Sequence, residues 1–468
     1  MLKSAWHHCL LRATFALTAP QQSFARGAME FTSVSTLALP IQASDNHISQ
    51  PSRPPSMMRW QANAVRDYCA LTADSSRFSE AGIAVECRQI QEGMMLTASN
   101  KSGAIPALTG LRFIAALMVF FSHYPIHGSE GWLKTFQLSG YSGVTFFFIL
   151  SGFMLTYNYL DSFENTPVAT TPNYLLSRVA RVYPLYALCV LYAWATTDTP
   201  DLLLKHLFLV QAWYGDVDVA MGLNGPAWSI SVEALLYLSL PLLIPVLGIT
   251  GITSKKSRLV VFFFLTLAAI FSLALFFWLS GLGELSAYDH GSAHRWLYRT
   301  PVTRLLDFCL GISAAIFYLR FAKSNTFPNH AWNIILACAG IAVIFLMGWS
   351  TNYLSSFGWD ASYAIPFTLI ILGVAMTQGS ILSRVLSTKT ALLLGEASYA
   401  FYLIHTLARG LLPDSADFGT TQTLISHLYF LTLVIMISIA AHLLIEKPAR
   451  RLILGGKKYH GARVGGVA

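Results

Sequence analysis

The chain has 468 residues, of which 54% are hydrophobic and only 12% are charged, and its mean hydropathy is +0.52. A soluble globular domain carries about 25% charged residues, so this composition excludes an ordinary soluble fold for most of the chain. The net charge of +8 is spread among short loops between apolar runs. That distribution favours loops that set membrane topology, so we expect membrane lipid and no nucleic acid as a partner.

Residues 1–100 differ from the rest because they hold no apolar run long enough to span a bilayer. The start, MLKSAWHHCLLRATFALTA, has basic residues and a short apolar stretch, as a weak signal or transit peptide would. We favour a poorly ordered extension or an over-called start instead. Met94 and Met95 stand a short polar distance before the first apolar run, so either is a candidate initiator.

From residue 105 onward, apolar runs recur at lengths close to the ~20 residues that a membrane-spanning helix needs. They predict spans at 106–125, 141–160, 179–197, 228–248, 259–280, 302–320, 332–350, 360–378, 390–410 and 424–445. The stretch 201–213 is shorter and is interrupted by Lys205 and His206, so we expect an interfacial or re-entrant helix there. The chain is thus predicted to be all-α, a polytopic transmembrane bundle of about ten spans over residues 101–452.

The charges of the loops predict how the bundle is oriented. Lysines and arginines cluster after the second, fourth, sixth and eighth spans and again in the basic tail, 453–468. The opposite loops hold most of the aspartates. The positive-inside rule therefore places both ends of the bundle in the cytoplasm, which requires an even number of spans. Near the second span, Gly140, Gly143 and Gly152 predict close helix approach.

The first span holds two ionisable side chains, Arg112 near its cytoplasmic end and His123 near its outer end. Ionisable groups inside spans are costly and are therefore candidates for function. Eleven positions on a helix make about three turns plus 20°, so both residues lie on one face, about 16 Å apart along the axis. The alternative is that Arg112 snorkels to the interface and that His123 is an interfacial residue. The shared helix face argues against this alternative.

Two arginines stand at the entry to the third span, SRVARVYPLY. Arg178 and Arg181 are three positions apart and therefore neighbours on a helix surface. Either they anchor the helix at the cytoplasmic interface, or they form a phosphate clamp, because guanidinium groups fit phosphate oxygens.

The fourth and ninth spans each carry an ionisable residue in the half that we expect to face outward. Glu233 lies about one and a half turns into the fourth span, near the expected level of His123, and a buried carboxylate there needs a partner such as that histidine. His405 lies in the outer half of the ninth span, again at the level of His123. Interhelical hydrogen bonding without catalysis is the alternative.

The outer segment YDHGSAHRWLYRTP contains a His-x3-His pair, at His290 and His294, together with two arginines. The segment either contacts an acceptor or is an ordinary polar loop. As a zinc site it lacks a recognisable third ligand, so we expect no metal.

Seven segments resemble, in this order, the motifs of the membrane acyltransferase-3 family, of the O-antigen acetylase type. They are LTGLRFIAALMVFFSHY, FFFILSGFML, RVARVYPLY, PAWSISVEALLYLSLP, RLLDFCLGI, LGEASYAFYLIH and IEKPAR. Each segment alone is a weak signal, but their joint order and spacing over about residues 105–452 is a strong one. Residues 1–100 have no counterpart in this pattern.

The resemblance implies an enzyme that transfers an acyl group, usually acetyl, from acyl-CoA to a hydroxyl. Typical acceptors are surface polysaccharide, lipopolysaccharide, peptidoglycan, lipid-linked sugars, and secreted glycosides or macrolides. By position, His123 would be the essential histidine and Arg112 would complete its motif. Arg178 and Arg181 match the second arginine motif, and with Arg112 they are expected to bind acyl-CoA.

Glu233 and His405 match polar positions of the family, and with His123 they form the expected catalytic set. In this interpretation, Glu233 orients His123, which acts either as a base or as an acyl carrier. The resemblance also implies a multi-pass protein of a bacterial-type inner membrane that acts on a carbohydrate, glycolipid or glycoside acceptor.

Two other classes of protein remain open at this point. A polytopic solute transporter or exporter would use His123, Glu233 and His405 as a proton relay. It would leave unexplained why arginines gather at the cytoplasmic side. A non-catalytic partner of a glycan-export complex is the third alternative.

Overall fold

Helices form the whole architecture of the residues that the computed structural model describes, namely 105–126, 128–322, 328–353, 355–412 and 420–455. These residues contain no β-strand, which confirms the predicted all-α class. They belong to one unit, Asn100–Ala468. The expectations for residues 1–100 and for most of the basic tail fall outside the described residues and stay predictions.

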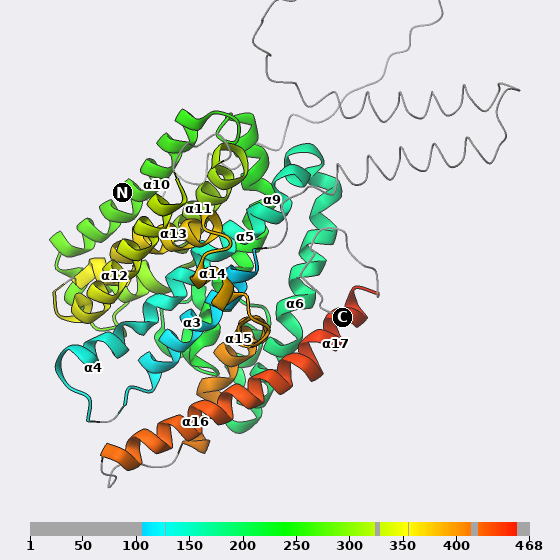
Figure 1. Ribbon diagram of the computed structural model, residues 1–468. Coiled ribbons are helices and arrows are strands. Elements are labelled where there is room, and N and C mark those ends of the chain that lie inside the picture. The colour runs from blue at the N-terminus through cyan, green and yellow to red at the C-terminus, as the bar shows by residue number, and fades with distance from the viewer. Residues whose placement is uncertain (1–104, 127, 323–327, 354, 413–419, 456–468) are drawn as a thin grey trace, which may run out of the picture. The chain divides into compact units, whose positions relative to one another are not determined.

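All ten predicted spans are helical (Figure 1). The corresponding helices are α3 Pro106–His123, α5 Gly143–Asn165, α6 Pro167–Thr196, α9 Trp228–Ile249, α10 Lys256–Leu279, α11 Pro301–Ile316, α12 Asn329–Tyr353, α13 Ala361–Met376, α15 Lys389–Leu407 and α16 Thr420–Ala441. Two of them continue further: α11 passes into a π-helical segment, Phe317–Phe321, and α16 passes through another, His442–Glu446, into α17 Lys447–Ile453.

Within the described part of the chain, nine helical segments are long and apolar enough to cross a membrane, and α15 is not among them. The sequence explains the exception, because α15 carries Glu396, Ser398 and His405. This helix packs against α3, α16 and α6, and Ser398 and His405 are buried. Neighbouring helices thus shield its polar side chains, so we count α15 as the tenth helix of the bundle. The cytoplasmic placement of both ends stays a prediction.

The chain between α6 and α9 does not cross the bundle. The stretch expected to be one interfacial or re-entrant helix, 201–213, is instead broken into short turns. They comprise a 3-10 turn at Pro200–Leu202, α7 at Leu203–Leu207 and a second 3-10 turn at Gln211–Trp213. The break follows α7, where Leu209 has a left-handed backbone with φ of 59°. Two further short segments, α8 Val217–Met221 and a turn at Gly225–Ala227, lead into α9.

The remaining short helices join longer ones. They are α4 Gly131–Leu138 with a turn at Ser139–Ser142, a turn at Leu282–Glu284, the π-helical His294–Arg299, a turn at Ser355–Trp359, α14 Ile381–Leu386 and a turn at Arg409–Leu411.

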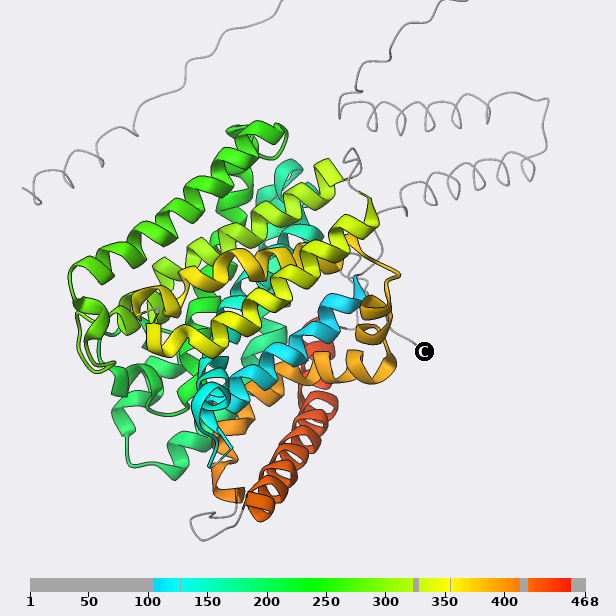
Figure 2. The ribbon, with the colours of Figure 1, turned by 60° about the vertical axis from the view of Figure 1, so that its left-hand side comes forward.

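Helices α5 and α11 form a closely packed central pair, which both ribbon views place inside the bundle (Figures 1 and 2). The close approach depends on two glycines. A Cβ atom on Gly152 would collide with the carbonyl oxygen of Phe308, and one on Gly311 would collide with that of Ile149. Small residues at a helix crossing let the backbones meet, as predicted for Gly152.

Helix α3 is held in the same way on two sides. A Cβ atom on Gly395 of α15 would collide with the carbonyl oxygen of Thr109, and one on Gly110 would collide with that of Leu386 in α14. On the α5 side, the predicted close approach of Gly140 is confirmed, because its Cβ would strike the carbonyl oxygen of Met118. These contacts fix the position of α3, and therefore of Arg112 and His123.

We expect Gly311→Ala to destabilise the protein by about 1–3 kcal/mol, because an added methyl group forces a tightly packed crossing apart. Gly340→Ala in α12 is the matched control, since a Cβ atom there meets nothing within 4 Å. Thermal unfolding of the purified protein in detergent measures the difference. Equal transition temperatures for the two variants would contradict the role given to this crossing.

Candidate active site

Two histidines from distant parts of the chain meet in the bundle. His123 is the last residue of α3, and its Nδ1 lies 3.0 Å from Nε2 of His405 on α15. The hydroxyl of Tyr124 donates a hydrogen bond to the carbonyl oxygen of His405 over 3.0 Å, which adds a second tie between the same helices. The prediction that His405 lies at the level of His123 is therefore confirmed.

The hydrogen-bond network assigns a tautomer to each ring. Nδ1 of His405 lies 3.2 Å from the carbonyl oxygen of Phe401, which only accepts, so this nitrogen carries the proton. Nε2 of His405 is then an acceptor, and Nδ1–H of His123 donates to it. The same Nδ1 lies 3.1 Å from the carbonyl oxygen of Val119, which agrees with its being protonated. The lone pair of neutral His123 is therefore on Nε2.

The two histidines differ in their surroundings. His405 is only 1% exposed and packs against the rings of Phe120, Phe401 and Tyr402. His123 is classed as exposed, and no described residue hydrogen-bonds its Nε2. His405 thus orients His123 from within the core, and the basic Nε2 of His123 is available to a substrate.

Glu233 does not pair with His123, contrary to expectation. Its carboxylate accepts a hydrogen bond of 2.7 Å from the hydroxyl of Tyr237, one helical turn further along α9. Its electrostatic partners are Arg112, Arg181 and Arg178. The sequence had placed Glu233 near His123 by counting turns along α9. The arginines attract this carboxylate, whereas a neutral histidine already bonded to His405 offers it little.

The three arginines of the predicted donor site gather around this carboxylate. Arg112 also lies within electrostatic range of Arg181, although the two residues come from different helices. The Arg178 guanidinium is buried, lies over the ring of Tyr174 and donates to the hydroxyl of Ser177. The described residues give the side chains of Arg112 and Arg181 no hydrogen bond, so their donors are available to a ligand.

A row of polar side chains leads from the histidine pair toward the arginines. The hydroxyl of Ser229 donates to that of Tyr402 over 2.9 Å, and Tyr402 precedes His405 by one turn of α15. Ser229, Glu233 and Tyr237 are spaced by four residues and therefore lie on one face of α9. Helices α9 and α15 thus place polar groups between the two predicted halves of the site.

A second buried charge cluster joins α11 to the start of α13, and two of its residues belong to the segment RLLDFCLGI, for which no role was predicted. Arg304 lies 2.8 Å from the Asp307 carboxylate and 2.9 Å from that of Asp360, the latter at ion-pair distance but not aligned as a hydrogen bond. Arg304 and Asp307 are fully buried. Their i, i+3 spacing within an apolar span was the available sequence signal.

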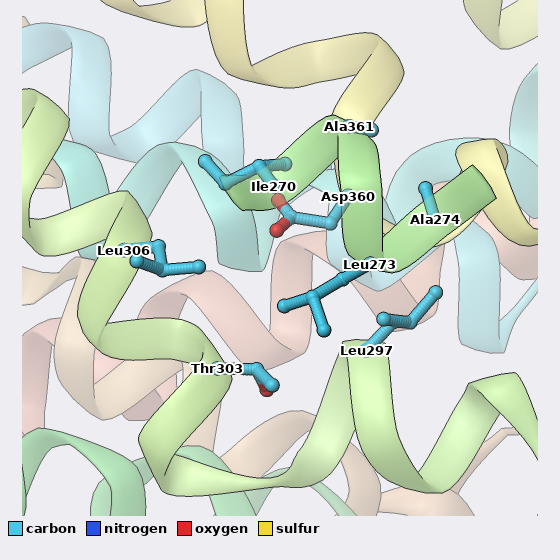
Figure 3. A pocket seen from close by; sticks show the side chains of 8 residues that line it. All are labelled: Ile270, Leu273, Ala274, Leu297, Thr303, Leu306, Asp360 and Ala361. Carbon is cyan, nitrogen blue, oxygen red and sulfur yellow. The ribbon is translucent and has the colours of Figure 1, made fainter. Parts of the chain in front are cut away.

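Figure 3 shows the Asp360 side chain among Ile270, Leu273 and Leu306 at the edge of a small cavity. The cavity volume is about 10 Å³, which is room for about one water molecule. This space is too small for a donor or an acceptor. We therefore assign the cluster a structural role, because removing one partner of a buried ion pair leaves an uncompensated charge.

The segment with the His-x3-His pair, which was predicted to lie outside, packs onto this cluster. Arg299 is 1% exposed, donates from Nε to Nδ1 of His294 over 3.3 Å, and donates from Nη2 to the carbonyl oxygen of Gly215. Burial, and then the nearby Arg299 and Arg304, lower the pKa of His294 from 6.5 to about 4. His294 is therefore a neutral acceptor for Arg299. The described residues contain no group of three or more His, Cys, Asp or Glu side chains that could hold a metal ion.

Comparison of the sequence with known proteins shows the family to which the chain belongs. A family model described as an acyltransferase domain matches residues 105–450. The chain belongs to the membrane acyltransferase-3 family. It is an enzyme that transfers acyl groups, and specifically a multi-pass membrane O-acyltransferase. No solved structure matches the chain.

Two curated relatives illustrate the range of the family. The chain is 27% identical to acyltransferase MdmB of Streptomyces mycarofaciens over an alignment of 380 positions that covers 75% of this chain and 92% of MdmB. It is 26% identical to O-acetyltransferase OatA of Staphylococcus aureus over an alignment of 324 positions that covers 64% of this chain and 50% of OatA. The chain thus spans nearly all of MdmB but about half the length of OatA.

We expect acid to weaken the packing of the outer segment through His294. Because the folded state lowers the pKa of this histidine, the unfolded chain binds more protons between pH 6.5 and about 4. Stability should therefore fall as the pH decreases through that window. His294→Asn keeps an acceptor for Arg299 but cannot be protonated there, so the variant should lose less stability.

The test is thermal unfolding of the wild type and His294→Asn at a series of pH values in that range. The transition temperature of the wild type should fall more steeply than that of His294→Asn, so that the two values converge or cross as the pH decreases. A constant difference at all pH values would contradict the assignment of His294 as a buried neutral acceptor.

Proposed function

We propose that this enzyme resides in a bacterial inner membrane and transfers an acyl group, acetyl in the first instance, from acyl-CoA to a hydroxyl of a carbohydrate, glycolipid or glycoside. The observation that carries the proposal is the histidine pair. His405 orients His123, and no described residue forms a hydrogen bond with the basic Nε2 of His123. The arginines that lack protein hydrogen bonds support a phosphate-rich donor.

The chemistry follows from the tautomer assigned to His123. As base, its Nε2 takes the proton of the acceptor hydroxyl while the oxygen bonds to the thioester carbonyl carbon. The carbon–sulfur bond then breaks, and the CoA thiolate leaves and takes up a proton. As acyl carrier, the same Nε2 would bond to the thioester carbonyl carbon while the carbon–sulfur bond breaks and the CoA thiolate leaves. The acceptor oxygen would then bond to that carbon, the carbon–nitrogen bond would break, and the hydroxyl proton would pass to the freed Nε2. Both routes use the same nitrogen, and both need Nδ1–H to be held by His405.

The two ends of α3 suit a donor and an acceptor on opposite sides of the membrane. If the predicted topology holds, Arg112, Arg178 and Arg181 face the cytosol, where acyl-CoA is found. His123 then lies about 16 Å further along the helix axis, toward the exported glycans. The polar row on α9 and α15 would line the route of the thioester arm.

We expect His123→Ala to lower the transfer of labelled acetyl from acetyl-CoA by at least about 100-fold, because a positioned base contributes that much or more. His427→Ala is the control: His427 also lies in a long apolar helix, but it is buried, and among the described residues its ring bonds only to Thr423 of its own helix. The assay uses membranes that contain each variant, and the product is lipid- or glycan-linked label.

Equal incorporation by the wild type and His123→Ala would contradict the catalytic assignment. Uptake or export of a solute by the wild type without any acyl transfer would instead support the transporter interpretation.

Glu233 offers a separate test because it lies with the arginines. Glu233→Gln removes a negative charge that repels donor phosphates, so we expect the KM for acetyl-CoA to fall about three- to tenfold. The kcat and its pH profile should stay near those of the wild type. A lower kcat with a shifted pH profile would mean that Glu233 acts on His123 after all.

A further inference from the structure

We propose that Arg450, on the C-terminal helix α17, is a further phosphate-binding residue that acts together with Arg178 and Arg181. This inference rests on the proposed function and extends it to a helix from the far end of the chain. The proposed ligand carries several negative charges. The test uses CoA and acetyl-CoA, whose phosphates supply such charges.

The first observation is where Arg450 lies. Helix α17 packs against α6, the helix that carries the arginine pair. Arg450 is half-buried there and lies within electrostatic range of both Arg178 and Arg181. No described residue forms an ion pair or hydrogen bond with its guanidinium group. Three guanidinium groups from two helices therefore share one region.

The second observation is that the nearby carboxylates are already engaged. Glu396 lies 3.1 Å from Nζ of Lys447 and 3.3 Å from Nε2 of His442. Glu446 lies 2.7 Å from Nδ1 of the same histidine. These contacts bind the end of α16 and the start of α17 to α15. They hold Arg450 in place, and they leave little negative charge to balance it.

The balance of charge then points to an anionic ligand. Arg112, Arg178, Arg181 and Arg450 bring four positive charges together. Glu233 faces the first three, while Glu446 lies within electrostatic range of Arg112 and Glu396 within range of Arg450. Like charges held close in a partly buried site repel one another, which is unfavourable unless a counter-charge binds. Three carboxylates against four arginines and Lys447 leave an excess of positive charge in place. A ligand with several phosphates, contacted by planar guanidinium forks, would neutralise it.

The adjacent residue provides a matched control. Arg451 carries the same charge on the same helix but is exposed, and the described residues give it no partner within the cluster. Arg450→Gln and Arg451→Gln therefore make the same change in net charge, and only the first is expected to alter the site.

The test is the binding of CoA to the full chain in nanodiscs by equilibrium dialysis, together with steady-state transfer from acetyl-CoA and from acetyl-pantetheine, which lacks the phosphates. We expect Arg450→Gln to weaken CoA binding and raise the KM for acetyl-CoA about tenfold, as loss of one charge-assisted hydrogen bond would. The kcat should be kept, the KM for acetyl-pantetheine should not change, and Arg450→Lys should restore part of the affinity.

Each outcome decides the question. If Arg450→Gln and Arg451→Gln bind CoA as the wild type does, the inference is wrong while the proposed function stands. If Arg450→Gln weakens use of both donors equally, or lowers kcat alone, its role is structural and the inference is again wrong. If the wild type neither binds CoA nor uses acetyl-CoA, the proposed function itself fails, and this inference fails with it.

Discussion

The hydrogen bond between His123 and His405 depends on how closely α3 and α15 approach each other. Gly395 permits that approach, because a side chain there would strike the backbone of α3 at Thr109. On the other side of α3, Gly110 permits the same closeness to α14. With α3 fixed on both sides, the two ends of one helix present an imidazole and a guanidinium at a set separation. The rest of the candidate site is built around these two groups.

The buried polar groups of the bundle fall into clusters with different properties. Arg304, Asp307 and Asp360 form a closed cluster, in which one guanidinium lies at ion-pair distance from two carboxylates beside space for about one water. In the histidine pair, both ring nitrogens of His405 are hydrogen-bonded, whereas the described residues leave Nε2 of His123 open. The arginines near Glu233 are the least compensated, since positive charge exceeds negative charge there. The excess of positive charge around Glu233 and the open Nε2 of His123 mark the polar groups that are available to a ligand.

Much of this arrangement could be predicted from the sequence. Ten apolar runs gave ten helices, and helical counting correctly put Arg112 and His123 on one helix with His405 at the level of the histidine. Counting turns failed for Glu233, because a side chain of that length reaches along its helix toward the strongest opposite charge. The role of Arg450, the last residue of the segment IEKPAR, was missed for a related reason. The two arginines near it belong to α6, more than 250 residues earlier, and spacing along one chain segment says nothing about contacts between distant helices.

The long sequence separation within the histidine pair affects how the protein is made. The two rings that meet in the site are 282 residues apart, with one on the first long helix and the other on α15. During synthesis, α3 enters the membrane before α14 and α15 have been made. The contacts of α3 with these two helices therefore form late in assembly. The tautomer that frees Nε2 of His123 cannot be fixed until α15 has been inserted. The order of synthesis therefore delays the hydrogen bond that orients His123 until α15, near the end of the chain, has been made.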